Sequence, residues 1–359
     1  MSVDKRLYHT LDAMRGVAAI MIVLWHARHM SAPIVLPSSY LAVDLFFVLS
    51  GFVLAFAYDG RLEHGMGTGR FFITRVIRLY PLYICGTLIG IFSGLVAYKL
   101  GAGELNATGL VLAIVAGLLM LPSPTFRQTP DVFVLNGPAW SLFFELFINL
   151  VFALFWKKLT RTGLIAIIAV SGLLMIASTI AEGHCDLGHK WTNFIYGFPR
   201  VTFSFFVGVL IHRLFKERRE STWIGLVLPF VLIPIFAFGP TGTLRIAYDL
   251  LCVMVVFPLL IIAGAAYDPP PLGVGISRFL GLISYPLYAI HVPIIELTRR
   301  TVRVAHFETL DLAPALGIAL TTVLVLVSWP LVKYYDEPVR RALTQRFAKR
   351  RELAPAQTT

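Results

Sequence analysis

The chain has 359 residues, of which 57% are hydrophobic and only 14% are charged, and its 31 Lys and Arg residues exceed its 20 Asp and Glu residues to give a net charge of +11. This balance excludes an ordinary soluble domain, in which about 25% of residues are charged. The excess positive charge lies in short segments between or after apolar runs, not in a basic soluble module, so we expect no nucleic-acid partner. One domain embedded in a lipid bilayer is therefore predicted.

Eleven apolar segments are long enough, or nearly long enough, to cross about 30 Å of hydrocarbon. Helices are expected because every backbone polar group in lipid must be paired within the protein. The segments are residues 14–30, 40–58, 79–98, 107–122, 138–156, 162–181, 195–214, 222–239, 245–266, 279–298 and 312–334. We predict an all-α polytopic bundle of about 10 transmembrane helices plus one short or re-entrant segment.

Lys and Arg residues mark the expected cytoplasmic side, following the positive-inside rule. The basic groups are Lys5 with Arg6, residues 59–78, residues 157–161, residues 213–219 and the tail after residue 340. All of these basic groups can be cytoplasmic only if one of the eleven segments does not cross the membrane. Residues 107–122 are the weakest candidate for a crossing. Arg299, Arg300 and Arg303 then lie outside, as an exception to the rule.

The start of the chain also resembles a signal peptide, but its apolar run continues to Met30, so we treat it as the first transmembrane span. The expected domains are a transmembrane domain over residues 1–340 and a basic, disordered cytoplasmic tail over residues 341–359.

The first span carries two ionisable residues, Arg15 and His26. Their separation of eleven positions places them within roughly 20° on one helix face and about 16 Å apart along the axis. Asp12 lies near the same stripe. An alternative is a snorkelling Arg15 and an interfacial His26 beside the belt aromatic Trp25.

Two further segments carry polar groups. Asp44, Ser50 and Gly51 lie in the second span, where Asp44 could instead be a helix cap and Gly51 a helix-packing residue. Arg75 and Arg78 are one turn apart at the next helix start. Two guanidiniums on one face suit a phosphate-bearing ligand, although positive-inside anchoring also accounts for them.

The fifth segment places Ser141, Glu145 and Asn149 on one stripe, with Trp140 beside it. A carboxylate among phenylalanines is a candidate proton carrier or a partner for a buried His or Arg, and a packing ion pair is the alternative.

Ser284, Tyr288 and His291 share a face of the tenth segment, where Pro286 and Pro293 expose backbone groups. A hydrogen-bonded core histidine is as well supported there as a catalytic one.

Residues 182–193 contain His184, Cys185, Asp186 and His189, which superficially resemble a metal site. Their spacing matches no tetrahedral ligand signature, so we expect no metal centre and interpret the stretch as a solvated connecting loop. Three scattered cysteines give no disulfide framework. Phosphate-binding loops, nucleophile elbows and dinucleotide fingerprints are likewise not found in the sequence.

Six ordered motifs resemble the acyltransferase 3 family of membrane-bound O-acyltransferases. They are LDAMRGVAAIMIVLWHA, in which ten residues separate Arg from His, VDLFFVLSGFVL, RVIRLYP, PAWSLFFELF, SYPLYAIH and YDEPVRR. The chain departs from the family at Ala42, where Gly is frequent, and at Leu146, where a second acidic residue is frequent. Neither departure removes an expected reactive group.

The resemblance implies transfer of an acetyl or other short acyl group from cytoplasmic acyl-coenzyme A, with acetyl-coenzyme A as the expected co-substrate and no permanently bound cofactor. Arg75 and Arg78 would bind its phosphates, and Arg15 would bind the donor or relay between the faces. His26 would act as general base or carry the acyl group, because imidazole titrates near neutrality. Glu145 or Asp44 would orient that imidazole. The expected supporting residues are Ser50, Gly51, Trp140, Ser141, Ser284, Tyr288 and His291.

The expected acceptor is a hydroxyl of an exopolysaccharide, lipopolysaccharide or similar carbohydrate, with a macrolide-like small molecule as the second choice. The family implies the bacterial cytoplasmic membrane, with both termini cytoplasmic, and allows hand-over to a separate periplasmic transferase. A proton-coupled transporter or flippase of a polar substrate is the main alternative, because buried charges also mark transport pathways.

Overall fold

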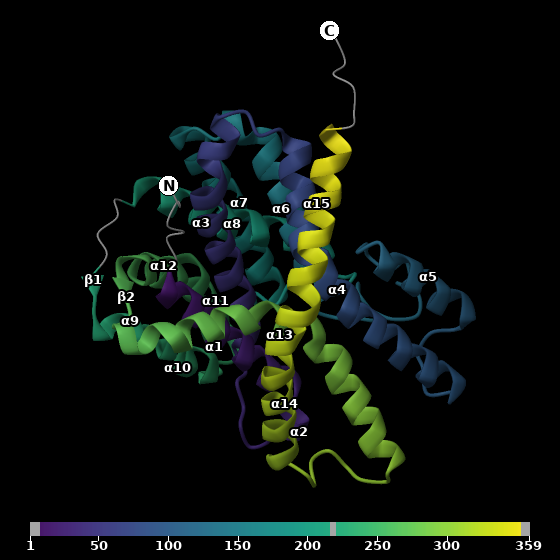
Figure 1. The fold of residues 1–359 in the computed structure, drawn as a ribbon. Helices are drawn as coiled ribbons and strands as arrows, with labels where there is room; N and C mark the ends of the chain where they lie inside the picture. The colour runs from purple at the N-terminus through teal and green to yellow at the C-terminus, as the bar shows by residue number, and fades with distance from the viewer. Residues whose placement is uncertain (1–7, 216–219, 353–359) are drawn as a thin grey trace.

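The computed structural model describes residues 8–215 and 220–352, and these residues are mostly helical with almost no strand (Figure 1). The α-helices are α1 (His9–His26), α2 (Arg28–Ser31), α3 (Ala42–Glu63), α4 (Thr68–Lys99), α5 (Ala107–Leu118), α6 (Ala139–Phe155), α7 (Arg161–Glu182), α8 (Gly197–Leu214), α9 (Trp223–Val227), α10 (Leu232–Ala237), α11 (Gly242–Leu251), α12 (Phe257–Ala266), α13 (Pro271–Val304), α14 (Ala315–Leu331) and α15 (Glu337–Glu352).

Short elements join or extend these helices. They are η1 (Ser39–Leu41), η2 (Trp156–Lys158), η3 (Phe194–Tyr196), η4 (Leu228–Val231), and the π-helical turns η5 (Cys252–Val256) and η6 (Val332–Asp336), which make α11 continuous with α12 and α14 continuous with α15. Two-residue strands β1 (Glu220–Ser221) and β2 (Tyr267–Asp268) pair in parallel.

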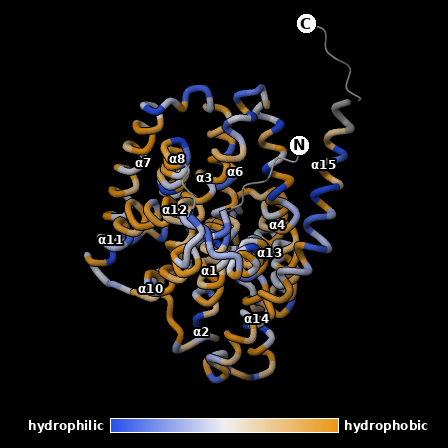
Figure 2. The backbone as a smooth tube through the Cα atoms, turned by 60° about the vertical axis from the view of Figure 1, so that its left-hand side comes forward, coloured by the Kyte–Doolittle hydropathy of each residue, from blue (hydrophilic) through white to orange (hydrophobic). Residues whose placement is uncertain are grey.

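Within the described residues, eight helical stretches are long and apolar enough to cross a membrane. Hydrophobic residues predominate along these stretches, as the colouring of α7 in Figure 2 shows. Two further predicted segments correspond to α1 and to the broken helix Trp223–Ala237, and the segment expected not to cross corresponds to the 12-residue helix α5. The predicted fold class, an all-α polytopic membrane protein, is confirmed.

Helices α1 and α13 run parallel to each other. Arg15 near the start of α1 contacts Gly281 and Ser284 of α13, and His26 at its end contacts His291. Both helices therefore begin on the same side, so an even number of crossings separates their starts. Counting α5 as a non-crossing helix satisfies this parity.

Helices α3 and α8 pack backbone to backbone in the core. A Cβ atom on Gly51 would lie 1.9 Å from the carbonyl oxygen of Phe205, and one on Gly208 would lie 1.9 Å from that of Val48. Only glycine fits at either position. The structure thus supports the helix-packing interpretation of Gly51.

Two details differ from, or add to, the sequence analysis. Residues 341–352, expected as part of a disordered tail, continue helix α15, which packs beside α4, while residues 353–359 lie outside the described residues (Figure 1).

Pro293 lacks the N–H that would bond the carbonyl of Ala289. Asn136 Nδ2 donates to that carbonyl at 3.1 Å, so the helix continues through the proline.

Candidate active site

His26 ends α1 and lies against His291 of α13. Its Nδ1 is 3.0 Å from the carbonyl oxygen of Ile22 and 3.2 Å from Nε2 of His291. The two rings meet edge to face, with 4.8 Å between their centroids. His291 is completely buried. The sequence placed both residues among the site candidates, and the structure brings them into direct contact.

The carbonyl groups around His291 determine the tautomers of both rings. Nδ1 of His291 faces the carbonyl oxygens of Leu287 at 3.1 Å and Tyr288 at 2.8 Å, and carbonyls only accept hydrogen bonds. Nδ1 of neutral His291 must therefore carry the proton, which leaves its Nε2 as an acceptor. His26 donates to that acceptor and to Ile22 through Nδ1–H, so Nε2 of His26 carries a free lone pair.

His26 lines a cavity that we call the histidine cavity. It has a volume of about 430 Å³. Its wall includes Trp140, Tyr288, Asp186 and His189 in addition to His26. A polar cavity with several aromatic walls is suited to a hydroxylated ligand.

A second cavity lies near the start of α1, at the opposite end of the α1–α13 pair. This basic cavity has a volume of about 780 Å³. Its arginines come from four helices and are Arg15, Arg78, Arg278, Arg340 and Arg341. Its acidic residues are Asp12, Asp336 and Glu337, so the cationic groups are in excess.

A third, narrower cavity of about 190 Å³ lies between these two, and we call it the middle cavity. It shares Arg15, Arg78 and Tyr285 with the basic cavity. It shares Val43 and Tyr288 with the histidine cavity. The three cavities are therefore adjacent in series along the α1–α13 pair.

Arg15 is held rigidly at the junction between the basic and middle cavities. Its Nε donates to Ser284 Oγ at 2.8 Å, and its Nη2 donates to the carbonyl of Gly281 at 2.8 Å and to Asp12 at 3.1 Å. Ser284 therefore positions Arg15. The predicted stripe of Arg15 and His26 on one face of α1 is the face that meets α13.

Glu145 is paired with Arg75 in the wall of the middle cavity. Their closest atoms are 3.4 Å apart, and Ser50 Oγ and Asn149 Nδ2 also donate to the carboxylate. The role expected for Glu145 in orienting His26 is not supported, because its contacts are with other residues. Arg75 lines the middle cavity, not the basic cavity, so of the expected phosphate-binding pair only Arg78 reaches the latter.

Asp44 forms a buried salt bridge with Arg200 of α8. Nη2 of Arg200 is 2.7 Å from one carboxylate oxygen, and both side chains are at most 1% exposed. Neither Asp44 nor Glu145 contacts the His26 ring within residues 8–215 and 220–352, which corrects the expectation that one of them orients it. His291 and the Ile22 carbonyl occupy that position instead.

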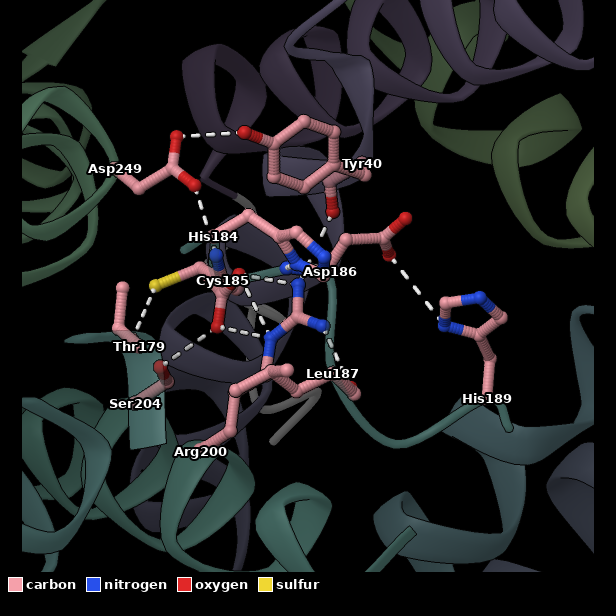
Figure 3. Close-up of polar contacts among 11 residues, drawn as sticks. Tyr40, Thr179, His184, Cys185, Asp186, Leu187, His189, Arg200, Ser204 and Asp249 are labelled. Carbon is pink, nitrogen blue, oxygen red and sulfur yellow. Dashed lines mark hydrogen bonds and ion pairs between the residues drawn. The ribbon is translucent and has the colours of Figure 1, made fainter. Parts of the chain in front are cut away.

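The connection 183–193, which we call the cavity loop, is anchored to the buried charges (Figure 3). Nη1 of Arg200 donates to the carbonyl of Leu187 at 2.8 Å, and the Cys185 amide donates to Asp249 at 2.8 Å. Asp249 also accepts a 2.6 Å hydrogen bond from Tyr40. The expectation of a solvated loop was therefore wrong for its centre, where Cys185 and Leu187 are buried.

Asp186 and His189 extend from the anchored loop to the histidine cavity. The Asp186 carboxylate is 3.6 Å from Nδ1 of His189, and Figure 3 shows the two side chains turned toward each other. Burial lowers the pKa of His189, while the Asp186 charge opposes that shift. The loop thus presents the carboxyl group of Asp186 and the imidazole of His189 to the cavity that contains His26.

Tyr288 lines both the middle and the histidine cavity, and Trp140 lines the histidine cavity. The hydroxyls of Tyr288 and Ser141 are 2.6 Å apart. The guanidinium of Arg200 lies 5.4 Å from the centre of a Trp140 ring, within range of a cation–π contact. Ser141 and Arg200 therefore hold these two aromatic side chains in place.

Arg200, Asp249 and Asp186 were not among the predicted site residues. A signal was present for the first two, because both are charged residues inside apolar segments, where charge calls for a partner. Asp186 gave no such signal, since a carboxylate in a connection is ordinary. No group of three or more His, Cys, Asp or Glu residues in the described chain is arranged to hold a metal ion.

The fold and the site define a polytopic helical membrane protein. Three adjacent cavities lie along its α1–α13 pair, and a histidine with a free ring nitrogen lines the last of them. The chain belongs to the acyltransferase 3 family, because the family's acyltransferase domain matches residues 8–333. It is an O-acyltransferase.

Two relatives match this chain over most of their own lengths. The chain is 40% identical over 179 residues to "Protein 2 in picA locus" of Rhizobium radiobacter, an alignment that covers 47% of this chain and 92% of that protein. It is 27% identical over 335 residues to "Acyltransferase MdmB" of Streptomyces mycarofaciens, covering 85% of this chain and 82% of the relative. No solved structure matches.

Proposed function

We propose that the protein transfers an acetyl or other short acyl group from acyl-coenzyme A, bound in the basic cavity, to a carbohydrate hydroxyl in the histidine cavity. The observation that carries this proposal is the serial arrangement of the basic, middle and histidine cavities, which ends at the free Nε2 of His26. The orientation expected from the basic connections would place the basic cavity on the cytoplasmic side of the bacterial inner membrane, with both termini cytoplasmic. The acceptor would then approach from outside.

The donor's chemistry follows the order of the cavities. Arg15 and Arg78 provide fork-shaped donors for phosphate oxygens at the inner end of the basic cavity. The middle cavity is lined largely by apolar side chains, among them Phe46, Phe47 and Leu54, and suits the uncharged pantetheine arm. The thioester at the end of that arm would reach the histidine cavity.

Two routes are consistent with a free Nε2 on His26. In direct transfer, Nε2 takes the acceptor's hydroxyl proton as the oxygen attacks the thioester carbonyl, the C–S bond breaks, and the leaving thiolate takes that proton. In the covalent route, Nε2 attacks the carbonyl first and expels the thiolate, and the acceptor then attacks the acyl-imidazole and passes its proton to the thiolate. His291 stabilises the tautomer that both routes need.

The acceptor side supports a carbohydrate. The histidine cavity combines Trp25, Trp140 and Tyr40 with the carboxylates of Asp131 and Asp186, and aromatic faces with planar polar groups suit a ring that carries hydroxyls. A separate periplasmic transferase would be the acceptor of the acyl group if the final glycan is too large to reach His26.

The test is label transfer by purified protein in lipid nanodiscs. Radiolabelled acetyl-coenzyme A and bacterial envelope glycans are incubated with the wild type, with His26→Ala and with His64→Ala, whose position is exposed on the connection after α3. We expect His26→Ala to lose about 10²- to 10⁴-fold in rate, the usual contribution of a general base, and His64→Ala to match the wild type. Radiolabel recovered on a peptide that contains His26, after a brief incubation without acceptor and a rapid neutral quench, would identify the covalent route.

Equal transfer by His26→Ala and the wild type would contradict the role of His26. Movement of a glycan across the membrane without consumption of acetyl-coenzyme A would instead favour the transporter or flippase.

A further inference from the structure

The rim of the basic cavity is built from three arginines that the donor site does not otherwise use. Arg278 comes from the first turns of α13, and Arg340 and Arg341 come from the first turn of α15. Arg15 and Arg78, in contrast, line both the basic and the middle cavity. The five guanidiniums thus form an inner pair and an outer group of three.

This division matches the order of charges along coenzyme A. Starting from the thioester, the molecule has an uncharged pantetheine arm, a pyrophosphate, and then a ribose with a 3′-phosphate and adenine. A pantetheine arm in the middle cavity brings the pyrophosphate to Arg15 and Arg78 at the junction. The 3′-phosphate, farther along the molecule, then falls among the outer arginines of the rim.

The three outer arginines differ in whether an acidic side chain of the protein already pairs with them. Arg340 pairs with Asp336 at 2.9 Å, and Arg341 pairs with Glu337 at 2.9 Å. Arg278 has no hydrogen-bond or ion-pair partner among the described residues, so one guanidinium is available without breaking an internal contact. Arg341 is 74% exposed, and ion pairs this exposed to solvent are weak, so a doubly charged phosphate can displace Glu337 at little cost.

We infer that Arg278 and the α15 residues Arg340 and Arg341 bind the 3′-phosphate of the donor and so select the nucleotide form of the acyl thioester. This inference rests on the proposed function. Its consequence is discrimination: a donor that presents the acyl group on phosphopantetheine alone, as an acyl carrier protein does, has no group to place among these arginines. Helix α15 is then part of the donor site.

The test compares ligands that differ by one phosphate. Dissociation constants of coenzyme A and 3′-dephospho-coenzyme A are measured by displacement of radiolabelled acetyl-coenzyme A from full-length protein in nanodiscs. We expect the dephospho form to bind at least about tenfold more weakly, because a charge-assisted hydrogen bond contributes about 1.5–3 kcal/mol and 1.4 kcal/mol is tenfold. The ratio should shrink at high salt, since the rim is exposed.

The double variant Arg278→Ala/Arg341→Ala should bring the two dissociation constants together by weakening coenzyme A alone. Arg340 is left in place because its loss would leave Asp336, which is 2% exposed, without its cation. Arg346→Ala provides the matched control, because Arg346 lies on an exposed position of α15 and does not line the cavity. It should keep the wild-type ratio.

Two results would overturn the inference, and they are distinguishable. Equal affinity of the wild type for coenzyme A and its dephospho form would remove the 3′-phosphate site and leave the proposed donor intact. Failure of acetyl-coenzyme A itself to bind would remove both the inference and the proposed donor. A wild-type ratio that persists in the double variant would assign the selectivity to other residues.

Discussion

Nε2 of His291 lies 3.2 Å from Nδ1 of His26, and the carbonyls behind His291 leave that Nε2 only the role of acceptor. A buried histidine of α13 thereby determines which nitrogen of His26 carries a proton. In many active sites a carboxylate has this task. Here the two carboxylates expected to perform it, Asp44 and Glu145, are each paired with an arginine.

Replacement of His291 by phenylalanine should lower turnover while leaving donor affinity unchanged. The ring volume is kept, but His26 loses the partner that holds Nδ1–H in place, and losses of about 10- to 100-fold are usual for such supporting residues. His291→Gln, whose amide oxygen can accept a hydrogen bond, should retain more activity than His291→Phe. Rates and coenzyme A dissociation constants measured on the three proteins check this order. Full turnover by His291→Phe would contradict the positioning role.

Breaking the Asp44–Arg200 pair should destabilise the protein severely. Both side chains are buried, and removing one partner from such a pair costs about 3–5 kcal/mol because the other charge stays buried without compensation. Asp44→Asn should therefore lower the melting temperature in detergent strongly, and Arg200→Met should do the same and release the cavity loop. The double replacement Asp44→Leu/Arg200→Met should recover part of the loss. Additive effects of the two single changes would show that the pair is not coupled.

Asp186→Asn should weaken acceptor binding without affecting the donor. The side chain lines the histidine cavity and not the middle cavity, so replacing one carboxylate oxygen by an amide nitrogen removes a hydrogen-bond acceptor for hydroxyls. We expect KM for the acceptor to rise about tenfold, as for loss of one charge-assisted hydrogen bond. KM for acetyl-coenzyme A should be unchanged. Glu182→Gln, at an exposed position three residues before the anchored part of the loop, is the control. An unchanged acceptor KM would rule Asp186 out of the acceptor site.

His189 should make stability depend on pH. Burial lowers the pKa of His189 in the folded protein, whereas the pKa of a histidine in an unfolded chain is about 6.5. Above that pH both states are neutral and the full stability is present. As the pH falls below it, the unfolded state binds the proton first, so the free energy of unfolding decreases until the pH passes the folded pKa.

His189→Gln cannot take up this proton, so its melting temperature should fall less than that of the wild type between about pH 7.5 and about pH 5.5. His64→Gln, at an exposed position, should follow the wild type. Parallel curves for His189→Gln and the wild type would show that His189 is protonated equally in both states.

Periodicity and hydropathy were sufficient to predict the helices, because lipid leaves the backbone few alternatives. They also predicted the shared face of Arg15 and His26, since one unbroken helix fixes that geometry. Pairings across helices did not follow from the sequence. Nothing local distinguishes a carboxylate that faces His26 from one that faces Arg200, and that choice depends on how α3, α6 and α8 pack.

The position of the cavity loop could not be predicted from its sequence either. Its residues have the composition of a solvated connection, and its function as a wall of the site arises from contacts with Arg200 and Asp249, which lie in distant helices. The end of the chain was misjudged for a related reason. Charge-rich residues after 340 suggest disorder in isolation, whereas packing against α4 and two internal ion pairs support α15 as a helix.

The packing of α1 against the parallel helix α13 fixes the distance between Arg15 and His26. Arg15 and His26 both contact this neighbouring helix, through Ser284 and His291, so the packing of the two helices fixes the distance between the two side chains. With the donor and the acceptor bound as proposed, any carbon added to the acyl chain would project beyond His26 into the space proposed for the acceptor. The acyl chain and the acceptor would then share one volume in the histidine cavity. A bulky acceptor would leave room only for a short acyl group, even though no separate pocket measures the length of that group.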